Sequence, residues 1–513
     1  MASTFYWHDY ETWGVNPKVH RPSQFAGLRT DLDFNVIGDP QVLYCQPPED
    51  TWPEPAACLI TGIDPIYARA HGLKEPEFIS SILRAMRQPG TCNIGYNNIR
   101  FDDEVTRHTA YRNFHDPYLQ EWQSGCSRWD LIDIVRCAYA LRPEGIVWPS
   151  ARADSGGVSL RLEDLSKANN IEHGKAHDAL SDVYATLNLA KFIAHKKPKL
   201  WQFLQKNRSK AAAENQLALG SGNIVGHVSS MFGKKCLYTS AILPLMRHPT
   251  VRNQIICYDL RHSSEQFAHL SPDELKLRIF SSKEDLGAKS RFPIKSVFIN
   301  RAPVLFPLTL FTEAVCKRLD LDLSAVHDHA RAVKHACFQD RLAEIFMSNN
   351  SYPKADCEAA LYEGFISNRD RTLCNEVNSC SIDSIAQEHF IFDDARLNEL
   401  FARYKARYAS SELSFAEQDD WQLWVRERLQ FGDTAFSSNA DEQEKKQSIN
   451  RSPAALSLTD YLTGIAALDV KKASGLVTAL LDDIEERCAR WAIDLANYPQ
   501  FERLRCKAKR TAA

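Results

Sequence analysis

Two carboxylates near the start of the chain, Asp9 and Glu11, are the residues whose type and spacing most suggest chemistry. They lie in the aromatic-rich segment Phe5-Tyr-Trp-His-Asp-Tyr-Glu-Thr12, which is predicted to be a β-strand. Successive side chains of a strand point to opposite faces, so these two share one face. A hard divalent cation such as Mg²⁺, which prefers oxygen ligands, would offset their mutual repulsion. An Asp-x-Glu alone is a weak signal, because a solvated strand end carries the same residues.

Further acidic residues occur where a cleft could collect them. Asp102 and Asp103 follow a predicted strand at the start of a helix, and Asp182 lies in the first two turns of a long predicted helix. His177 stands five positions before Asp182. Each also has an ordinary structural explanation, such as a helix cap, a solvated helix residue or a packed histidine. The combination predicts one shared site, made of Asp9, Glu11, Asp102, Asp182 and His177, with Asp103 as the rival to Asp102.

The elements that must position these residues follow an α/β pattern over about the first 190 residues. Strands are predicted at 5–12, 34–38, 42–45 and 91–95, and helices at 77–86, 129–141, 160–168 and 178–194. Strand signals return at 225–229, 236–240, 255–259 and 295–299, around a helix that begins with the capping box Ser271-Pro-Asp-Glu274. This second part therefore reads as a small β domain with added helices.

The last third of the chain is predicted to be helical. Helices are expected at 354–365, 394–409, 414–429, 458–467 and 476–496, followed by a basic tail at 503–510. The polar segment 434–455 has few apolar residues and is predicted to be a flexible insertion. We therefore expect three domains, at 1–195, 196–350 and 351–513.

The composition is that of an ordinary globular protein, with 513 residues, 44% hydrophobic residues and a formal net charge of −3. This balance argues against a uniformly basic nucleic-acid coat but leaves room for a local basic groove. The fourteen cysteines are scattered singly, without zinc spacing, which favours reduced, buried thiols. No signal peptide or membrane span is predicted, so a cytoplasmic location is expected.

The pattern of acidic residues with H-x-x-x-x-D resembles the DEDDh family of 3′→5′ exonucleases, which have a ribonuclease H-like fold. Several longer strings are similar to the bacterial exonuclease I family, whose members digest single-stranded DNA. They are His8-Asp-Tyr-Glu-Thr, Arg21-Pro-x-Gln-Phe-Ala, Leu59-Ile-Thr-Gly-Ile, Gly95-Tyr-Asn-Asn-x-Arg-Phe-Asp-Asp-Glu, Ser127-Arg-Trp-Asp-Leu, Ala140-Leu-Arg-Pro-Glu-Gly-Ile and Ala176-His-Asp-Ala. The resemblance covers residues 4 to about 430. It implies an exonuclease domain, an SH3-like barrel domain that closes over DNA, and a C-terminal helical domain.

The resemblance implies a processive enzyme of DNA repair or recombination that releases 5′-mononucleotides. Two Mg²⁺ ions, for which Mn²⁺ may substitute, would activate the nucleophile and relieve charge on the leaving oxygen. Asp9, Glu11, Asp102 and Asp182 would be the metal ligands. His177 would be the general base, because its ordinary pKa lies near neutrality.

The resemblance also implies a set of DNA contacts. Arg161 would hold a phosphate near the scissile bond, and Ile60 would stack or wedge against a base. The remaining implied substrate contacts are Glu11, Arg107, Trp122, Arg136, Lys210, Asn253, Phe280, Lys295, Phe298 and Tyr362. Without the resemblance, Arg161 would be a surface helix residue, Trp122 could be core, and Phe280 and Phe298 could equally belong to a barrel core.

The implied partners are single-stranded DNA and the C-terminal tail of single-stranded-DNA-binding protein, with the chain itself a monomer. A docking site for that tail needs basic residues beside an apolar pocket, for which 303–340 offers Lys317 and Arg318, with Arg301 nearby. Two other functions stay open at this point. One is an RNA-trimming or proofreading exonuclease, which the added domains disfavour. The other is an inactive DNA-binding scaffold, which the intact acidic set disfavours.

Overall fold

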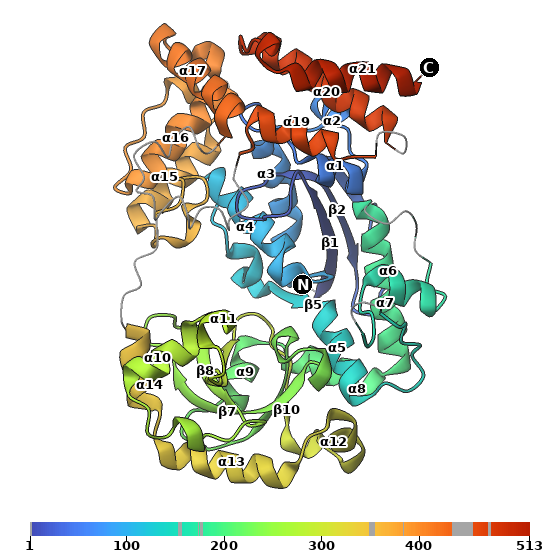
Figure 1. Cartoon of the computed structure of the whole chain (residues 1–513), viewed down its shortest axis with the longest axis vertical. Helices are drawn as coiled ribbons and strands as arrows, with labels where there is room; N and C mark the ends of the chain where they lie inside the picture. Colours follow the sequence, from blue (N-terminus) through green and yellow to red (C-terminus); the bar gives the residue numbers. More distant parts are fainter. Residues whose placement is uncertain are drawn as a thin grey trace.

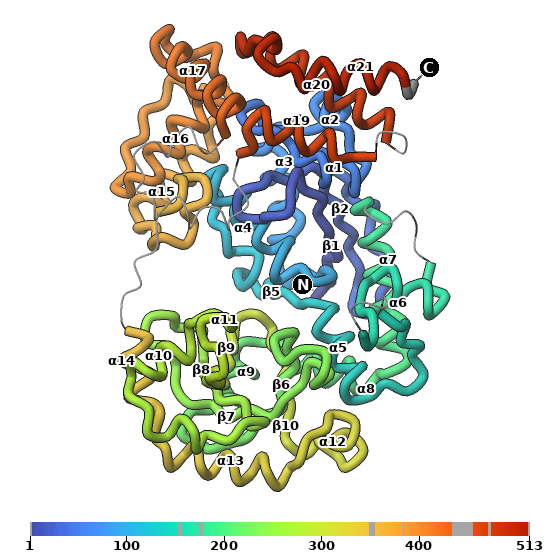
Figure 2. Tube along the Cα trace, viewed as in Figure 1, coloured from blue at the N-terminus to red at the C-terminus, as the bar shows by residue number. Residues whose placement is uncertain are grey.

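The computed structural model describes residues 3–151, 156–172, 174, 178–347, 354–382, 384–432, 455–469 and 473–512. Figure 1 shows three regions, with a sheet and its helices in the centre, a second sheet at one end and a group of helices at the other. The expected order of an α/β region, a β region with added helices and a helical region is confirmed. The tube in Figure 2 shows that the chain passes through the three regions in sequence order before its last helices pack against helices of the first region.

The first sheet has five strands in the order β3-β2-β1-β4-β5. The central strand β1 pairs with β2 antiparallel and with β4 parallel, and β4 pairs with β5 parallel. The strands are β1 (Thr4–Thr12), β2 (Pro22–Thr30), β3 (Gln41–Tyr44), β4 (Thr91–Gly95) and β5 (Ser127–Asp130). Because β1 is central, residues near its C-terminal end can be reached by helices on both faces.

Helices cover both faces of this sheet (Figure 1). The alternation predicted for β1 is confirmed: Phe5 and Trp7 pack in the core that includes Val183, whereas Tyr6 and Tyr10 pack with Phe78. The helices are α1 (Pro55–Thr61), α2 (Pro65–His71), α3 (Glu75–Met86), α4 (Asp102–Arg112), α5 (Leu131–Leu141), α6 (Leu162–Ala168) and α7 (Ala179–Lys196). Helix α7 lies against β1 and β2 and so brings its first turn to the C-terminal end of β1.

The prediction of a strand at 34–38 is wrong. This segment forms only an isolated bridge between Thr30 and Val36, Phe34 has a positive φ of 67°, and Val36 and Ile37 are exposed. The second strand is instead β2, which the sequence analysis missed. Its residues are buried on both faces, so its sequence does not alternate between apolar and polar side chains.

The second sheet is antiparallel, in the order β10-β6-β7-β8-β9. Its strands are β6 (Val225–Val228), β7 (Thr239–Arg247), β8 (Gln254–Asp259), β9 (Ile294–Phe298) and β10 (Leu305–Pro307). The predicted capping box of Ser271 and Glu274 is confirmed at the start of α10. The helices of this region are α8 (Pro198–Asn207), α9 (Lys210–Gln216), α10 (Pro272–Phe280), α11 (Lys283–Leu286), α12 (Glu313–Leu319), α13 (Leu323–Ala336) and α14 (Gln339–Met347).

The third region is helical, but the prediction of a helix at 354–365 is wrong, and a helix over the basic segment 503–510 was not predicted. Residues 354–365 contain only a short 3₁₀ turn at Ala360–Tyr362, and the basic segment 503–510 belongs to α21, which packs Phe501 and Leu504 against the core. The helices are α15 (Asn368–Ser379), α16 (Ala395–Tyr408), α17 (Phe415–Phe431), α19 (Leu458–Ala466), α20 (Ser474–Arg490) and α21 (Pro499–Ala512). The predicted insertion at 434–455 lies almost wholly outside the described residues.

A buried set of ion pairs joins the first and third regions. Glu358 forms ion pairs with Arg21 and Arg407, each with a nitrogen–oxygen distance of 2.8 Å. Arg21 also pairs with Glu75 at 2.6 Å, and Arg407 pairs with Asp50 at 2.9 Å. Because all five side chains are buried, these contacts tie the two regions firmly together.

The cysteines fit the expectation of reduced thiols. All fourteen are free and most are buried.

Candidate metal centre and nucleic-acid interface

Three carboxylates from two elements meet at the end of the first sheet. Asp9 and Glu11 lie on one face of β1, and Asp182 lies in the first turn of α7. One oxygen from each of the three residues lies within 4.8 Å of the others. All three side chains are half-buried, so the group faces a partly open site. Oxygens at this spacing can share a divalent cation.

Asp102 reaches the same site from the opposite side of the strand. It is the first residue of α4 and is buried. Its Oδ1 accepts a hydrogen bond of 3.0 Å from the backbone N–H of Tyr10, which lies between Asp9 and Glu11 in sequence. Its charge is the largest single contribution from a neighbour to the raised pKa of Asp9.

Asp103 faces elsewhere. Its Oδ2 accepts a hydrogen bond of 2.8 Å from Arg128, and its Oδ1 accepts one of 3.0 Å from Asn98. Although burial opposes ionisation, Arg128 holds the pKa of Asp103 below its ordinary value. With both oxygens engaged in these contacts, Asp103 already has its counter-charge, and the geometry favours Asp102 as the member of the acidic set.

The electrostatics of the acidic set favour cation binding. Burial, followed by the charges of Asp102, Glu11 and Asp182, raises the pKa of Asp9 well above its ordinary value. Burial, Asp182 and Asp178 together raise the pKa of Glu11 to about 8. Burial and Asp103 raise the pKa of Asp102. Each pKa is raised because the carboxylates are buried away from water and repel one another. A bound cation would offset this repulsion and favour the ionised forms.

The candidate base His177 lies outside the described residues. The next residue, Asp178, is described and caps α7: its Oδ2 accepts hydrogen bonds from the backbone N–H and the hydroxyl of Ser181, at 3.2 and 3.0 Å. Asp178 contributes to the raised pKa of both Asp9 and Glu11, so it lies within electrostatic reach of the site. The sequence analysis missed it, although the string Ala176-His-Asp-Ala contained it.

The candidate DNA contacts of the first region differ in how exposed they are. Ile60, at the end of α1, and Trp122 are well exposed, with 56% and 65% of their surface accessible, and Arg161, just before α6, is also exposed. Exposed apolar side chains of this size suit stacking against bases. Arg136 is mostly buried; it pairs with Asp133 at 2.6 Å and lies over the ring of Tyr238.

Arg107 and Tyr362 contact each other where all three regions meet. The guanidinium of Arg107 bonds twice to Glu121, at 2.6 and 2.8 Å, and once to Glu104, at 2.8 Å. The hydroxyl of Tyr362 donates to Glu104 at 2.6 Å and accepts from Arg107 at 3.1 Å. Arg301 of the second region lies 3.8 Å from the same Glu104. The tyrosine ring is half-exposed beside this cluster.

The candidate contacts of the second region are divided between surface and core. Lys210 and Phe280 are exposed, while Asn253 and Phe298 are half-buried. Lys295 is buried, donates to the hydroxyl of Ser229 at 2.9 Å, and has a pKa lowered to about 8 mainly by burial. The five residues therefore differ in their access to a bound strand.

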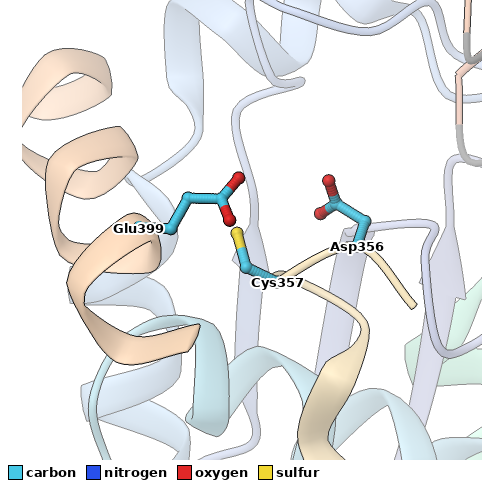
Figure 3. A group of neighbouring side chains, drawn as sticks. All are labelled: Asp356, Cys357 and Glu399. Carbon is cyan, nitrogen blue, oxygen red and sulfur yellow. The ribbon is translucent and has the colours of Figure 1, made fainter. Parts of the chain in front are cut away.

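A second acidic group, shown in Figure 3, consists of Asp356, Cys357 and Glu399. Arg403 lies between its carboxylates, bonding Asp356 at 3.0 and 2.8 Å and also pairing with Glu399. Burial raises the pKa of the Cys357 thiol. Since Arg403 already pairs with both carboxylates, this group is explained by ion pairing.

The carboxylate set on a mixed sheet, with a helix on each face supplying one member, is the arrangement of a metal-dependent DEDDh exonuclease. The family model described as "Exonuclease" matches residues 6–190, which contain the whole set. The model described as "Exonuclease I SH3-like domain" matches 208–348, and "Exonuclease I C-terminal domain" matches 355–465. The chain belongs to the exodeoxyribonuclease I family.

Close relatives span almost the full chain. Exodeoxyribonuclease I of Haemophilus influenzae is 40% identical over 469 residues, covering 91% of this chain and 99% of that protein. Exodeoxyribonuclease I of Escherichia coli is 41% identical over 445 residues, covering 86% and 93%. The family resemblance expected from the sequence strings is thereby confirmed.

Solved structures agree with the fold. A moderately thermophilic exonuclease I from Methylocaldum szegediense superimposes with a TM-score of 0.85 at 38% identity, covering 96% of this chain and 100% of that chain. The zinc-bound form of the E. coli exonuclease I complex with single-stranded DNA gives a TM-score of 0.84 at 38% identity, covering 95% of this chain and 100% of that chain.

Among the described residues, no helix is long and apolar enough to cross a membrane.

Proposed function

We propose that this protein is a processive exonuclease that removes nucleotides from the 3′ end of single-stranded DNA and releases 5′-mononucleotides. The observation that carries the proposal is the convergence of Asp9, Glu11 and Asp182 within 4.8 Å, with Asp102 bonded beside them. Membership of the exodeoxyribonuclease I family supports the choice of DNA, because related structures are described as complexes with DNA oligonucleotides. Three domains, at 1–195, 196–350 and 351–513, would all contribute to this activity.

The resident cofactor in this proposal is a pair of Mg²⁺ ions, for which Mn²⁺ can substitute. The donor set fits such ions, because it consists of carboxylates, and burial followed by mutual repulsion raises the pKa values of Asp9 and Glu11. Asp9, Glu11, Asp102 and Asp182 would hold them. When bound, the ions would supply charge relief on the attacking and leaving oxygens.

The protein's own residues would orient the strand and move one proton. His177 takes a proton from the water that attacks the terminal phosphorus. The bond from that phosphorus to the 3′ oxygen of the preceding nucleotide then breaks and releases the 5′-mononucleotide, and the 3′ oxygen takes a proton from solvent water to give a strand with a free 3′-OH. Arg161, which is exposed just before α6, would hold a phosphate of the strand. This proton transfer requires a neutral imidazole at working pH.

The strand would pass across all three regions. Ile60 and Trp122 offer exposed apolar surface in the first region, Phe280 in the second, and Tyr362 at their meeting point with the third. Stacking on such side chains is tolerant of sequence, which suits an enzyme that must digest any strand. The further contacts proposed are Glu11, Arg107, Arg136, Lys210, Asn253, Lys295 and Phe298.

For the partner, we propose that the C-terminal tail of single-stranded-DNA-binding protein docks in a pocket of about 850 Å³ in the second region. Its lining combines apolar side chains such as Phe203 and Leu308 with the cations Arg331 and Lys334, as an apolar tail with a terminal carboxylate requires. Arg318 instead donates to a backbone oxygen on α5 and lies over the ring of Tyr139. The enzyme would act as a cytoplasmic monomer.

The decisive experiment digests end-labelled DNA and RNA oligonucleotides of one sequence with Mg²⁺ and excess unlabelled trap. We expect the enzyme to remove successive nucleotides from the 3′ end of the labelled DNA during a single binding event. The Asp9→Asn variant should be inactive, whereas Asp39→Asn, an exposed carboxylate of the same region, should match the wild type. Preference for RNA, release that stops after one nucleotide, or full activity of Asp9→Asn would each contradict the proposal.

A further inference from the structure

Gln24 is a buried polar residue at the edge of an apolar part of β2. On β2, side chains at alternate positions face α7, and the next two in this row, Ala26 and Leu28, lie in the apolar core together with Val183 of α7. Gln24 is itself only 2% exposed. A primary amide placed there needs partners for both its oxygen and its nitrogen.

A partner for each of these two groups lies at the start of α7. The backbone N–H of Ala179 donates to the Gln24 side-chain oxygen at 3.2 Å, and the amide nitrogen of Gln24 donates to Asp178 Oδ1 at 3.4 Å. Ala179 is the first residue of the helix, so its N–H has no partner within the helix. The other oxygen of Asp178 caps Ser181. Gln24 therefore fixes the start of α7 at both the backbone and the cap.

The opposite side of Gln24 adjoins the metal ligands. In the antiparallel pairing of β1 and β2, Gln24 is the direct partner of Glu11. The helix that Gln24 holds carries Asp182 one turn further on, and an oxygen of Asp182 lies within 4.8 Å of oxygens of Glu11 and Asp9. One side chain thus spans from the strand pair that presents Glu11 to the helix that presents Asp182.

We propose that Gln24 is a positioning residue for the metal-dependent reaction, holding the N-terminus of α7 so that Asp182 faces the carboxylates of β1. The proposal rests on the proposed function. An apolar side chain of equal volume would fill the space but would leave the Ala179 N–H unpaired and Asp178 Oδ1 without its donor. The α7 start would then be held only by its own cap and by packing.

The test compares Gln24→Met, which preserves volume, with Gln41→Met as the matched control. Gln41 lies on β3 and bonds Tyr6 at 2.7 Å and Ser81 at 2.9 Å, away from α7. Titrating metal-free protein with Mn²⁺ by calorimetry, without DNA, we expect the Kd to rise about tenfold in Gln24→Met, as is typical when a residue that orients ligands is removed. The value for kcat should fall similarly, while KM for DNA stays within twofold.

Amide hydrogen exchange supplies a second readout that needs no metal. In Gln24→Met the amides of the first turn of α7 should exchange faster, and those of β3 should not. Gln24→Asn, which keeps the amide but shortens its reach, serves if Gln24→Met does not fold. Unchanged Mn²⁺ affinity and unchanged exchange at the α7 start in a folded variant would overturn the proposal. If the wild type itself binds no Mn²⁺ at this site, the proposed function fails, while the exchange data still decide the role of Gln24.

Discussion

Glu358→Gln is the substitution that best tests the junction between the first and third regions. Glu358 is 8% exposed and accepts ion pairs from Arg21 and Arg407 at 2.8 Å each. Although burial opposes ionisation, these arginines hold the pKa of Glu358 well below its ordinary value. The glutamine has the same shape but carries no charge, so two buried guanidinium groups would lose a shared counter-ion.

The expected cost follows from the burial of the partners. Breaking a buried pair by removing one partner costs about 3–5 kcal/mol. Glutamine keeps one acceptor oxygen, and Arg407 keeps its ion pair with Asp50. We therefore expect the substitution to lower the free energy of unfolding by about 3 kcal/mol. For domains of 150–250 residues, about 2–4 °C of melting temperature is lost per kcal/mol, so the transition should fall by about 6–12 °C.

Differential scanning calorimetry at pH 7 measures this shift, with Glu399→Gln as the control. Glu399 also pairs with an arginine of the third region, Arg403, but its side chain is 57% exposed, so its loss should cost less than about 1 kcal/mol. Equal melting temperatures for the two variants would refute the reasoning.

The pH dependence gives a second check. A carboxylate whose folded pKa lies below its unfolded value of about 4.5 stabilises the protein above that pH and loses the contribution as pH falls through the folded pKa. The difference between the wild type and Glu358→Gln should therefore be full at pH 7 and shrink below about pH 4.5. A stability difference between the wild type and Glu358→Gln that grows as the pH falls would contradict this reasoning.

Three further predictions concern the site. Asp182→Asn should lower kcat by at least about a hundredfold and weaken Mn²⁺ binding, with DNA affinity measured in chelator unchanged, because the lost group holds metal rather than DNA. The pKa of Glu11 is raised to about 8 in the metal-free protein, so protons compete with metal below that pH. The increase in melting temperature caused by Mn²⁺ should therefore grow from pH 6 to pH 8.5. An increase that does not change with pH would contradict this prediction. Because burial lowers the pKa of Lys295 to about 8, DNA affinity measured by fluorescence anisotropy should fall between pH 7 and pH 9 in the wild type and change less in Lys295→Met.

Much of the fold could be predicted where local patterns and burial agree. The alternation in β1, the capping box of α10 and the strand β4 were all predicted from short stretches of sequence. The errors have a common cause, which is that neighbouring elements decide burial. The segment 34–38 is apolar enough for a strand but lies exposed, whereas α21 has a basic sequence but docks its apolar side on α20.

The candidate site could be predicted as a set of residue types, but the residues that hold it in place could not. Gln24 was part of a string that supported the family resemblance, yet its role depends on hydrogen bonds to residues 154 and 155 positions away. Arg21 lies in the same string and bonds Glu358, 337 positions away. No periodicity connects such partners, because their contacts exist only once helix and sheet have packed.

The choice between Asp102 and Asp103 shows what the three-dimensional arrangement adds. Adjacent residues of a helix point about 100° apart, so the two neighbouring carboxylates at the start of α4 face different surroundings. Asp102 accepts the Tyr10 N–H between Asp9 and Glu11, while Asp103 binds Arg128, whose other nitrogen donates to the backbone oxygen of Asn300 in the second region. One helix start thus supplies a proposed ligand of the candidate metal centre and a contact to the region that packs against it. Because a shift of this turn would move both, the docking of the second region and the placement of Asp102 are mechanically linked.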